Sequence, residues 1–191
     1  MKTVIFNGSP RKSGDTAILI KEFCSELRGE ITVFSAYTDE ISPCIDCRYC
    51  HEHSGCSIAD GMNGIYKSVS DCDNLVIASP LHFSELSGPL LSLFSRFQTY
   101  YAAKYIRKNP EKIKRKNGVL ILAGGGSGSS ESALRTAGLI FHMVNTECIS
   151  IVTSLKTDVL PASLDDIALS EARNAGKLLS SLSKTGNPCQ L

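Results

Sequence analysis

The chain has 191 residues, a formal net charge of +1, and 42% hydrophobic against 20% charged residues. This composition is typical of a globular protein and argues against disorder, while the near-zero charge argues against a dedicated nucleic-acid binder. No apolar run approaches the roughly 20 residues that a membrane helix needs, and the apolar start is too short for a signal peptide. We therefore expect one domain over residues 1–191, in the cytoplasm, with neither a nucleic-acid nor a membrane partner.

Short apolar runs alternate with helical patterns along the chain. The expected strands are residues 3–6, 31–34, 74–78, 118–122 and 148–152. The expected helices are residues 17–27, 61–70, 87–108, 131–143 and 164–182, followed by a loose tail at 185–191. Strands that are apolar without alternation suit a parallel sheet that is covered on both faces. The sequence therefore predicts a three-layer α/β sandwich around a five-stranded parallel sheet.

Three loop-like segments follow the first, third and fourth of these strands. They are residues 8–16, 79–88 and 124–130. In an open α/β sheet, ligands bind in the crevice beyond the carboxyl ends of the strands. We therefore expect the three segments to lie at one edge of the sheet and to form a single binding site.

The first of these segments joins a strand to a helix. It differs from a Walker phosphate loop, because five residues separate Gly8 from Gly14 and Asp15 stands in place of the lysine. It still offers the cation Arg11, the free N–H groups of a helix N-terminus, and the hydroxyls of Ser9, Ser13 and Thr16. We predict that it binds a phosphate. The alternative is a plain strand–helix turn capped by Asp15.

The pattern Gly-Ser-Pro-Arg-x-x-Gly-x-Thr at residues 8–16 resembles the FMN-phosphate loop of the NADPH-dependent FMN reductase family. The turn at 79–84 resembles that family's second flavin loop, and the glycine run at 124–126 resembles its third. The resemblance covers essentially the whole chain and implies a flavodoxin-like fold with strand order 2-1-3-4-5. The cofactor-binding residues that it implies are Ser9, Arg11, Ser13, Asp15 and Thr16, then Pro80, Leu81, His82, Phe83 and Ser84, then Gly124, Gly125 and Gly126.

Two positions depart from the family's usual pattern. Asp15 stands where the family has Asn or Lys, and His82 stands where it has Tyr. Because a carboxylate repels a phosphate, we expect Asp15 to cap the helix with its side chain turned away.

The glycines at 124–126 also have a physical rationale. Without side chains, their backbone N–H groups can approach a flavin ring and stabilise the negative charge of its reduced form. A dinucleotide fingerprint is less favoured, because the run follows the fourth strand and lacks the full glycine spacing. The remaining alternative is a flexible turn.

Four of the eight cysteines, Cys44, Cys47, Cys50 and Cys56, fall within 13 residues, in a loop that we place at 42–60. Thiolates at this spacing can wrap a compact iron–sulfur cube, whereas zinc usually prefers two separated C-x2-C pairs. The pattern resembles the cluster motif of the iron–sulfur flavoproteins, a branch of the same family, and implies a [4Fe–4S] cluster. The alternative is free thiols without a cluster. Because this loop follows the second strand, we expect it at the same edge of the sheet as the flavin loops.

Several other side chains receive structural interpretations. We expect Cys24, Cys72, Cys148 and Cys189 to be small buried hydrophobes, and His51 and His53 to face solvent. The surplus aromatics Phe97, Tyr101 and Tyr105 on the long helix predict a subunit interface, and hence a homodimer or homotetramer. The basic stretch 107–116 is interpreted as solvated, or alternatively as a contact for the 2′-phosphate of NADPH.

These features predict an FMN-dependent oxidoreductase. The resemblance implies that electrons come from NAD(P)H or a reduced carrier and pass through FMN to a small-molecule or protein acceptor. No side chain is indicated as a catalytic acid or base, because the chemistry belongs to FMN. Two alternatives stay open: a non-enzymatic electron carrier that resembles flavodoxin, and a redox sensor whose cysteines switch by disulfide formation.

Overall fold

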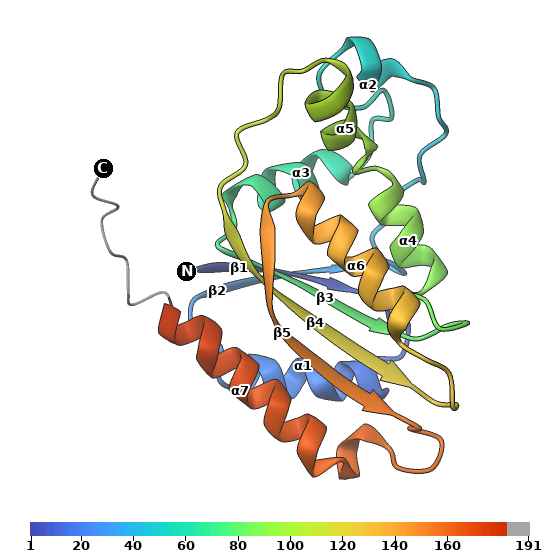
Figure 1. Ribbon diagram of the computed structural model, residues 1–191, viewed down its shortest axis with the longest axis vertical. Helices are drawn as coiled ribbons and strands as arrows, with labels where there is room; N and C mark the ends of the chain where they lie inside the picture. Colours follow the sequence, from blue (N-terminus) through green and yellow to red (C-terminus); the bar gives the residue numbers. More distant parts are fainter. Residues whose placement is uncertain (183–191) are drawn as a thin grey trace.

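The computed structural model describes residues 1–182, and its middle layer is a five-stranded parallel sheet in the order β2-β1-β3-β4-β5 (Figure 1). The strands are β1 (Lys2–Asn7), β2 (Glu30–Ser35), β3 (Asn74–Pro80), β4 (Lys116–Gly124) and β5 (Thr146–Leu155). The predicted flavodoxin-like order is confirmed. The tail at 185–191 and Cys189 lie outside the described residues.

Helices cover both faces of this sheet. The helices α1 (Asp15–Ser25) and α7 (Asp166–Leu182) lie on one face, and α3 (Met62–Asp71), α4 (Gly88–Ser95) and α6 (Glu131–Met143) lie on the other (Figure 1). Successive strand residues point to opposite faces, so Ile5 joins the core with Phe23 of α1, while Phe6 joins the core with Leu90 of α4. Burial on both faces explains why β3 and β4, in the middle of the sheet, contain apolar residues without alternation.

The predicted helix at 87–108 is interrupted. The chain forms α4, then α5 (Gln98–Tyr101), and then a π-helix, η1 (Ala102–Ile106). The turn between α4 and α5 tightens, because Arg96 N–H bonds to Leu93 O at 3.1 Å and Phe97 N–H bonds to Phe94 O at 2.9 Å. The uninterrupted helix was therefore a wrong prediction, and Arg96 lies buried at the break.

The same break separates the three aromatics that were predicted to form a subunit interface. Phe97 is 4% exposed and packs against Phe6, Phe94 and Tyr100, so it belongs to the core. Tyr101 and Tyr105 remain exposed, with their ring centroids 5.0 Å apart. The predicted face is thus wrong for Phe97, whose ring is used within the chain.

Two short helical elements complete the described part, α2 (Tyr49–Glu52) and the 3-10 helix η2 (Ala162–Leu164). Within residues 1–182, no helix combines the length and the apolar character that crossing a bilayer requires. The scattered cysteines differ from one another: Cys72 is buried as expected, Cys24 is half-buried, and Cys148 is exposed, contrary to expectation, because it lies on the edge strand β5.

Candidate functional site

The loop between β1 and α1 is folded by its own polar groups. Ser9 N–H donates to Asn7 Oδ1 at 2.9 Å, and Arg11 N–H donates to Ser9 Oγ at 3.3 Å. Ser9 and Thr16 are buried, whereas Arg11 and Ser13 are exposed. The loop ends at the N-terminus of α1, where the first N–H groups have no partner inside the helix and favour an anion.

Asp15 does not cap α1 as predicted. The N-cap is Gly14, which makes no side-chain cap, and Asp15 is the first residue of the helix. Its Oδ1 accepts the N–H of Ala162 at 3.0 Å, and its Oδ2 lies 3.2 Å from Arg11 Nη2. The capping role expected of Asp15 is therefore wrong, because its side chain makes no cap and instead ties the loop to η2. Both of its carboxylate oxygens are already bonded within the chain.

The segment after β3 forms a tight turn. His82 and Glu85 exchange backbone hydrogen bonds, at 2.9 Å from His82 N–H and 3.0 Å from Glu85 N–H. Phe83 and Ser84 between them have φ values of 53° and 65°, which matches the mirror-image turn that connects hairpins. The Phe83 side chain is fully exposed at the tip. His82 is also exposed.

Glu85 anchors this turn to α6. Its carboxylate accepts the N–H of Leu86 at 2.8 Å and the hydroxyls of Ser132 at 2.7 Å and Thr136 at 2.8 Å. Burial alone would raise the pKa of Glu85, but these hydrogen bonds outweigh burial and hold the pKa below its ordinary value. The turn is therefore held rigidly against the start of α6.

The glycine run after β4 lies against both neighbouring segments. Leu81 N–H donates to Ala123 O at 2.7 Å, so the second and third loops are in contact. A side chain at Gly125 would place its Cβ 2.6 Å from Asp158 Oδ1, so the carboxylate of Asp158 lies close against this glycine. Gly124 O accepts the N–H of Thr157 at 2.9 Å, which brings the segment after β5 to the same edge.

The three predicted flavin loops therefore meet at the carboxyl edge of the sheet, which we call the rim (Figure 1). The first loop joins them through Gly8, whose N–H donates to Ala78 O at 2.8 Å. A Cβ at Gly8 would lie 2.7 Å from Ser87 Oγ, so this backbone also packs closely against the start of α4. Open helix N–H groups, a glycine backbone and a nearby cation are a chemically suitable set for a flavin phosphate and ring.

The four clustered cysteines line one cavity, which we call the cysteine cavity. Cys47 Sγ lies 3.1 Å from Ser57 Oγ, and Cys44 Sγ accepts the N–H of Asp46 at 3.5 Å. Within residues 1–182, no three His, Cys, Asp or Glu side chains are grouped closely enough to hold a metal ion. In kind and number the donors fit a group held by four thiolates. Holding such a group requires the loop to contract around it.

The thiols of the cysteine cavity differ in acidity. The hydrogen bond with Ser57, supported by the backbone N–H of Tyr49, lowers the pKa of the exposed Cys47 thiol. Burial, together with the neighbouring cysteines, raises the pKa of Cys50. Of these two thiols, Cys47 therefore ionises more readily.

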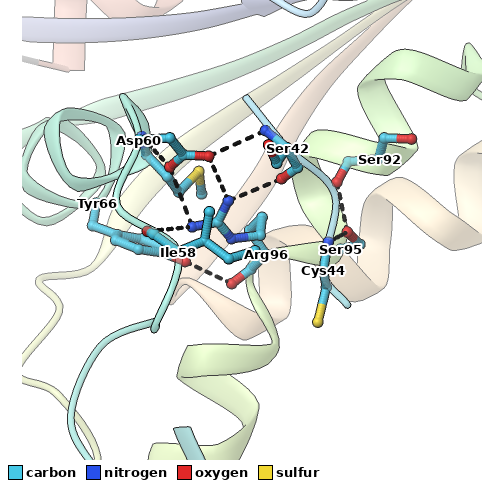
Figure 2. A network of polar contacts seen from close by, with 9 residues as sticks. Ser42, Cys44, Ile58, Asp60, Tyr66, Ser92, Ser95 and Arg96 are labelled. Atoms are coloured by element: carbon cyan, nitrogen blue, oxygen red, sulfur yellow. Dashed lines mark hydrogen bonds and ion pairs between the residues drawn. The ribbon is translucent and has the colours of Figure 1, made fainter. Parts of the chain in front are cut away.

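Arg96 and Asp60 hold the two ends of the cysteine loop, residues 42–60, together (Figure 2). Arg96 is 1% exposed, and its Nη1 donates to Asp60 Oδ2 at 2.7 Å and to Ser42 O at 2.9 Å. Its Nη2 donates to Asp60 Oδ1 and Ile58 O, both at 3.3 Å. Burial alone would raise the pKa of Asp60, but the bonds from Arg96 and from the backbone N–H groups of Met62 and Ser42 lower it.

Three further hydrogen bonds position the cysteine loop. Cys44 N–H donates to Ser95 Oγ at 2.9 Å, which ties the first cysteine to the end of α4 (Figure 2). Arg107, which follows the π-helix, donates from Nη1 to Cys50 O and to His53 O, the latter at 2.9 Å. The basic side chain that was interpreted as solvated is therefore used within the protein. His53 is exposed as expected, whereas His51 is half-buried.

The cysteine loop does not open at the rim. Helix α4 starts at the rim with Gly88 and runs away from it, because β3 and β4 are parallel and α4 connects them. The loop is bonded to Ser95, the last residue of α4, which lies about 10 Å along the helix from Gly88 at about 1.5 Å per residue. The expectation that both sites share one edge is wrong, because the chain after β2 turns back over the α3–α4 side of the sheet (Figure 1).

Sequence reasoning missed the role of four residues that position these loops, namely Asp60, Glu85, Arg96 and Arg107. One signal was available. Arg96 is the one charge in a segment, 89–97, whose other residues are apolar or serine, and such a residue is seldom buried without a partner. Its partner Asp60 is 36 positions away, so no local pattern indicates the pair.

Known proteins resemble this chain in sequence. Residues 1–156 match the family described as NADPH-dependent FMN reductase. An iron-sulfur flavoprotein of Methanocaldococcus jannaschii is 28% identical over 192 residues, covering 96% of this chain and 98% of that protein. An iron-sulfur flavoprotein of Archaeoglobus fulgidus is 30% identical over 142 residues, covering 73% of this chain and 70% of that protein.

Solved structures share the fold. An NAD(P)H:quinone oxidoreductase from Methanothermobacter marburgensis superposes with a TM-score of 0.71 at 18% identity, covering 100% of this chain and 99% of that one. An FMN-dependent NADH-azoreductase from Bacillus anthracis, solved in complex with FMN, superposes with a TM-score of 0.63 at 17% identity, covering 94% and 99%. At these identities the likeness concerns the fold alone.

Proposed function

Because the chain belongs to the NADPH-dependent FMN reductase family, we propose that it is an oxidoreductase that carries electrons from NAD(P)H or a reduced carrier, through FMN, to an acceptor. The observation that carries this proposal is the meeting of three loops at the rim beside the open N-terminus of α1. Crevices at the carboxyl ends of parallel strands are where open α/β sheets bind ligands.

In this proposal the first loop holds the phosphate. The buried Ser9 and Thr16 and the exposed Ser13 offer hydroxyls, and Arg11 exchanges its contact with Asp15 for the phosphate. Asp15 remains bonded to Ala162 N–H, which keeps its negative charge engaged away from the anion.

The other two loops hold the ring. The segment 80–84 forms one wall, fixed through Glu85, and the backbone of 124–126 lies along the polar edge of the flavin. The bound flavin supplies hydride chemistry, while the protein orients it and tunes its electronics. The close fit of Gly125 against Asp158 leaves a carboxylate beside this edge.

We further propose that Cys44, Cys47, Cys50 and Cys56 hold a [4Fe–4S] cluster. The support is the shared cavity, the four-thiolate donor set and the likeness to iron-sulfur flavoproteins. The seven described cysteines are all free thiols, which is compatible with the reducing cytoplasm that we propose as the location. A homodimer or homotetramer remains part of the proposal, now through the exposed Tyr101 and Tyr105.

One observation favours a second candidate, a cysteine-based redox sensor. The Cys47 thiol is exposed, and its pKa is lowered by the hydrogen bond with Ser57. Accessible thiols with a lowered pKa are the ones that react with oxidants. A sensor would form a disulfide in this loop and contain no cluster.

Protein prepared and kept without oxygen separates these functions. We expect a flavin absorbance spectrum, broad cluster absorbance, and sustained oxidation of NADH or NADPH when a quinone or ferricyanide is supplied as acceptor. Flavin reduction by dithionite without sustained nicotinamide oxidation would identify a carrier instead. Oxidant-dependent loss of free thiols in iron-free protein would identify the sensor.

A further inference from the structure

A buried arginine borders the cysteine cavity, and its contacts are directed at one segment. The side-chain bonds of Arg96 all go to Ser42, Ile58 and Asp60, which stand at the two ends of the cysteine loop (Figure 2). Burying a guanidinium is costly unless it is paired, and Asp60 supplies the pairing carboxylate. The arginine therefore acts as a clamp on that loop rather than as a general core contact.

The clamp leaves one donor unused. Among the described residues, the Nε of Arg96 is buried and has no hydrogen-bond partner. Arg96 also lines the cysteine cavity, in company with all four cysteines. A buried donor without an acceptor is unfavourable, and it is explained if an anionic group held in this cavity completes its bonding.

Resting on the proposed cluster function, we propose that Arg96 is a positioning residue for the anionic group in the cysteine cavity. It closes the cysteine loop so that four thiols face one space. Its Nε–H and positive charge then stabilise the negative charge of the group that the thiols hold. Net charge and hydrogen bonds around the sulfurs are what set the reduction potential of such a group.

The first experiment measures iron, acid-labile sulfide and FMN in full-length protein prepared without oxygen. Arg96→Met removes both the guanidinium N–H donors and the positive charge, whereas Arg96→Lys keeps only the charge. Arg173→Met is the matched control. Arg173 pairs with Glu22 on the opposite face of the sheet and is 38% exposed. We expect at least a several-fold loss of iron per FMN in Arg96→Met, an intermediate loss in Arg96→Lys, and the wild-type ratio in Arg173→Met.

The midpoint potential of the remaining clusters distinguishes positioning from a merely structural role. Removing a nearby positive charge should make the potential more negative in Arg96→Met, while Arg96→Lys stays close to wild type. Wild-type iron content together with a wild-type potential in Arg96→Met would overturn the proposal. Equal shifts in Arg96→Met and Arg173→Met would overturn it as well, since they would reflect overall charge.

A metal-free assay keeps the test independent of the cluster. In iron-stripped protein, we expect a thiol reagent at fixed pH to modify Cys44, Cys50 and Cys56 several-fold faster in Arg96→Met than in wild type. The exposed Cys148 serves as an internal reference and should react equally in both. If wild-type protein holds no iron, the cluster assignment fails, and unchanged modification rates would then overturn the positioning role too.

Asp60→Asn guards against a folding defect in the arginine variants. It keeps Arg96 and its bonds to Ser42 O and Ile58 O, but it removes the charge that pairs with the guanidinium. FMN content and circular dichroism confirm that each variant is folded. We expect Asp60→Asn to lie between wild type and Arg96→Met in both iron content and thiol reactivity, and wild-type values in both would count against the clamp.

Discussion

The rim and the cysteine loop are held in place by different means. At the rim, strand ends bring the loops together through backbone bonds such as Leu81 N–H to Ala123 O, at 2.7 Å. The cysteine loop contains one four-residue helix, and buried or half-buried arginine side chains fix its backbone. We therefore expect the rim, which is held by backbone hydrogen bonds between strand ends, to tolerate the loss of single side chains. The cysteine loop, which is held by arginine side chains, should depend on each of them.

The largest expected effect separates the two sites outright. Replacing any one of Cys44, Cys47, Cys50 or Cys56 by Ala should remove or convert the cluster, so that iron falls clearly below the about four per chain expected for a cubane held by four thiolates. FMN should stay bound, since its phosphate loop is a separate element. Cys148→Ala is the control and should keep the cluster. Loss of FMN together with iron would show that the two sites are not independent.

A substantial but smaller effect is expected at the rim. Arg11→Ala should weaken FMN binding by about 1.5–3 kcal/mol, the usual range for a hydrogen bond to a charged group, which is about 10- to 150-fold in affinity. Riboflavin, which lacks the phosphate, should bind wild type and Arg11→Ala equally. Titration of apo-protein by flavin fluorescence measures both. Equal affinities of wild type for FMN and riboflavin would refute the phosphate assignment.

Glu85 tests whether the rim depends on any single side chain. Glu85→Gln should lower the free energy of unfolding by about 1–2 kcal/mol at neutral pH, because its hydrogen bonds with two hydroxyls and a backbone N–H are weakened. The folded-state pKa of Glu85 is lowered, so its contribution is present above the ordinary value of 4.5 and is lost as pH falls through the folded pKa.

The pH dependence provides the check on this carboxylate. Urea unfolding should separate wild type from Glu85→Gln near neutral pH, and the two curves should converge near pH 3. The exposed Glu131 opens α6 and makes no side-chain bond that the structure shows within the described residues, so Glu131→Gln should resemble wild type at both pH values. A gap that stayed constant down to pH 3 would contradict a role for the ionised carboxylate.

The smallest effect on the chain itself is expected for the exposed tyrosines. Changing Tyr101 and Tyr105 together to Lys should reduce the oligomer size in light scattering, because two charges would enter a desolvated contact. FMN affinity and the stability of each subunit should change little, since both rings are largely exposed. A wild-type protein that is monomeric at micromolar concentration would exclude this interface.

The rim was largely predictable from the amino-acid order. Strands with apolar runs such as residues 74–78 and 118–122 place apolar side chains on both faces of the sheet, and these side chains are stable only when both faces are buried. The sheet and its loop-bearing edge therefore follow from local composition. The phosphate-binding role of the loop at 8–16 was also predicted from local sequence. Its hydroxyls and Arg11 stand at the junction of a strand and a helix, and every helix N-terminus has free N–H groups.

Only the tertiary structure decided how these pieces are held. Asp15 bonds to Ala162, 147 positions away, and Arg96 bonds to Asp60, 36 positions away, so no local pattern could choose either partner. The interruption between α4 and α5, where Arg96 is buried, likewise runs against the helical spacing of the surrounding residues. The four cysteines were evident from their spacing, but their place at the far end of α4 depends on long-range contacts. Local sequence determines what a segment can form, whereas the energy of a buried polar contact depends on groups brought together only by folding.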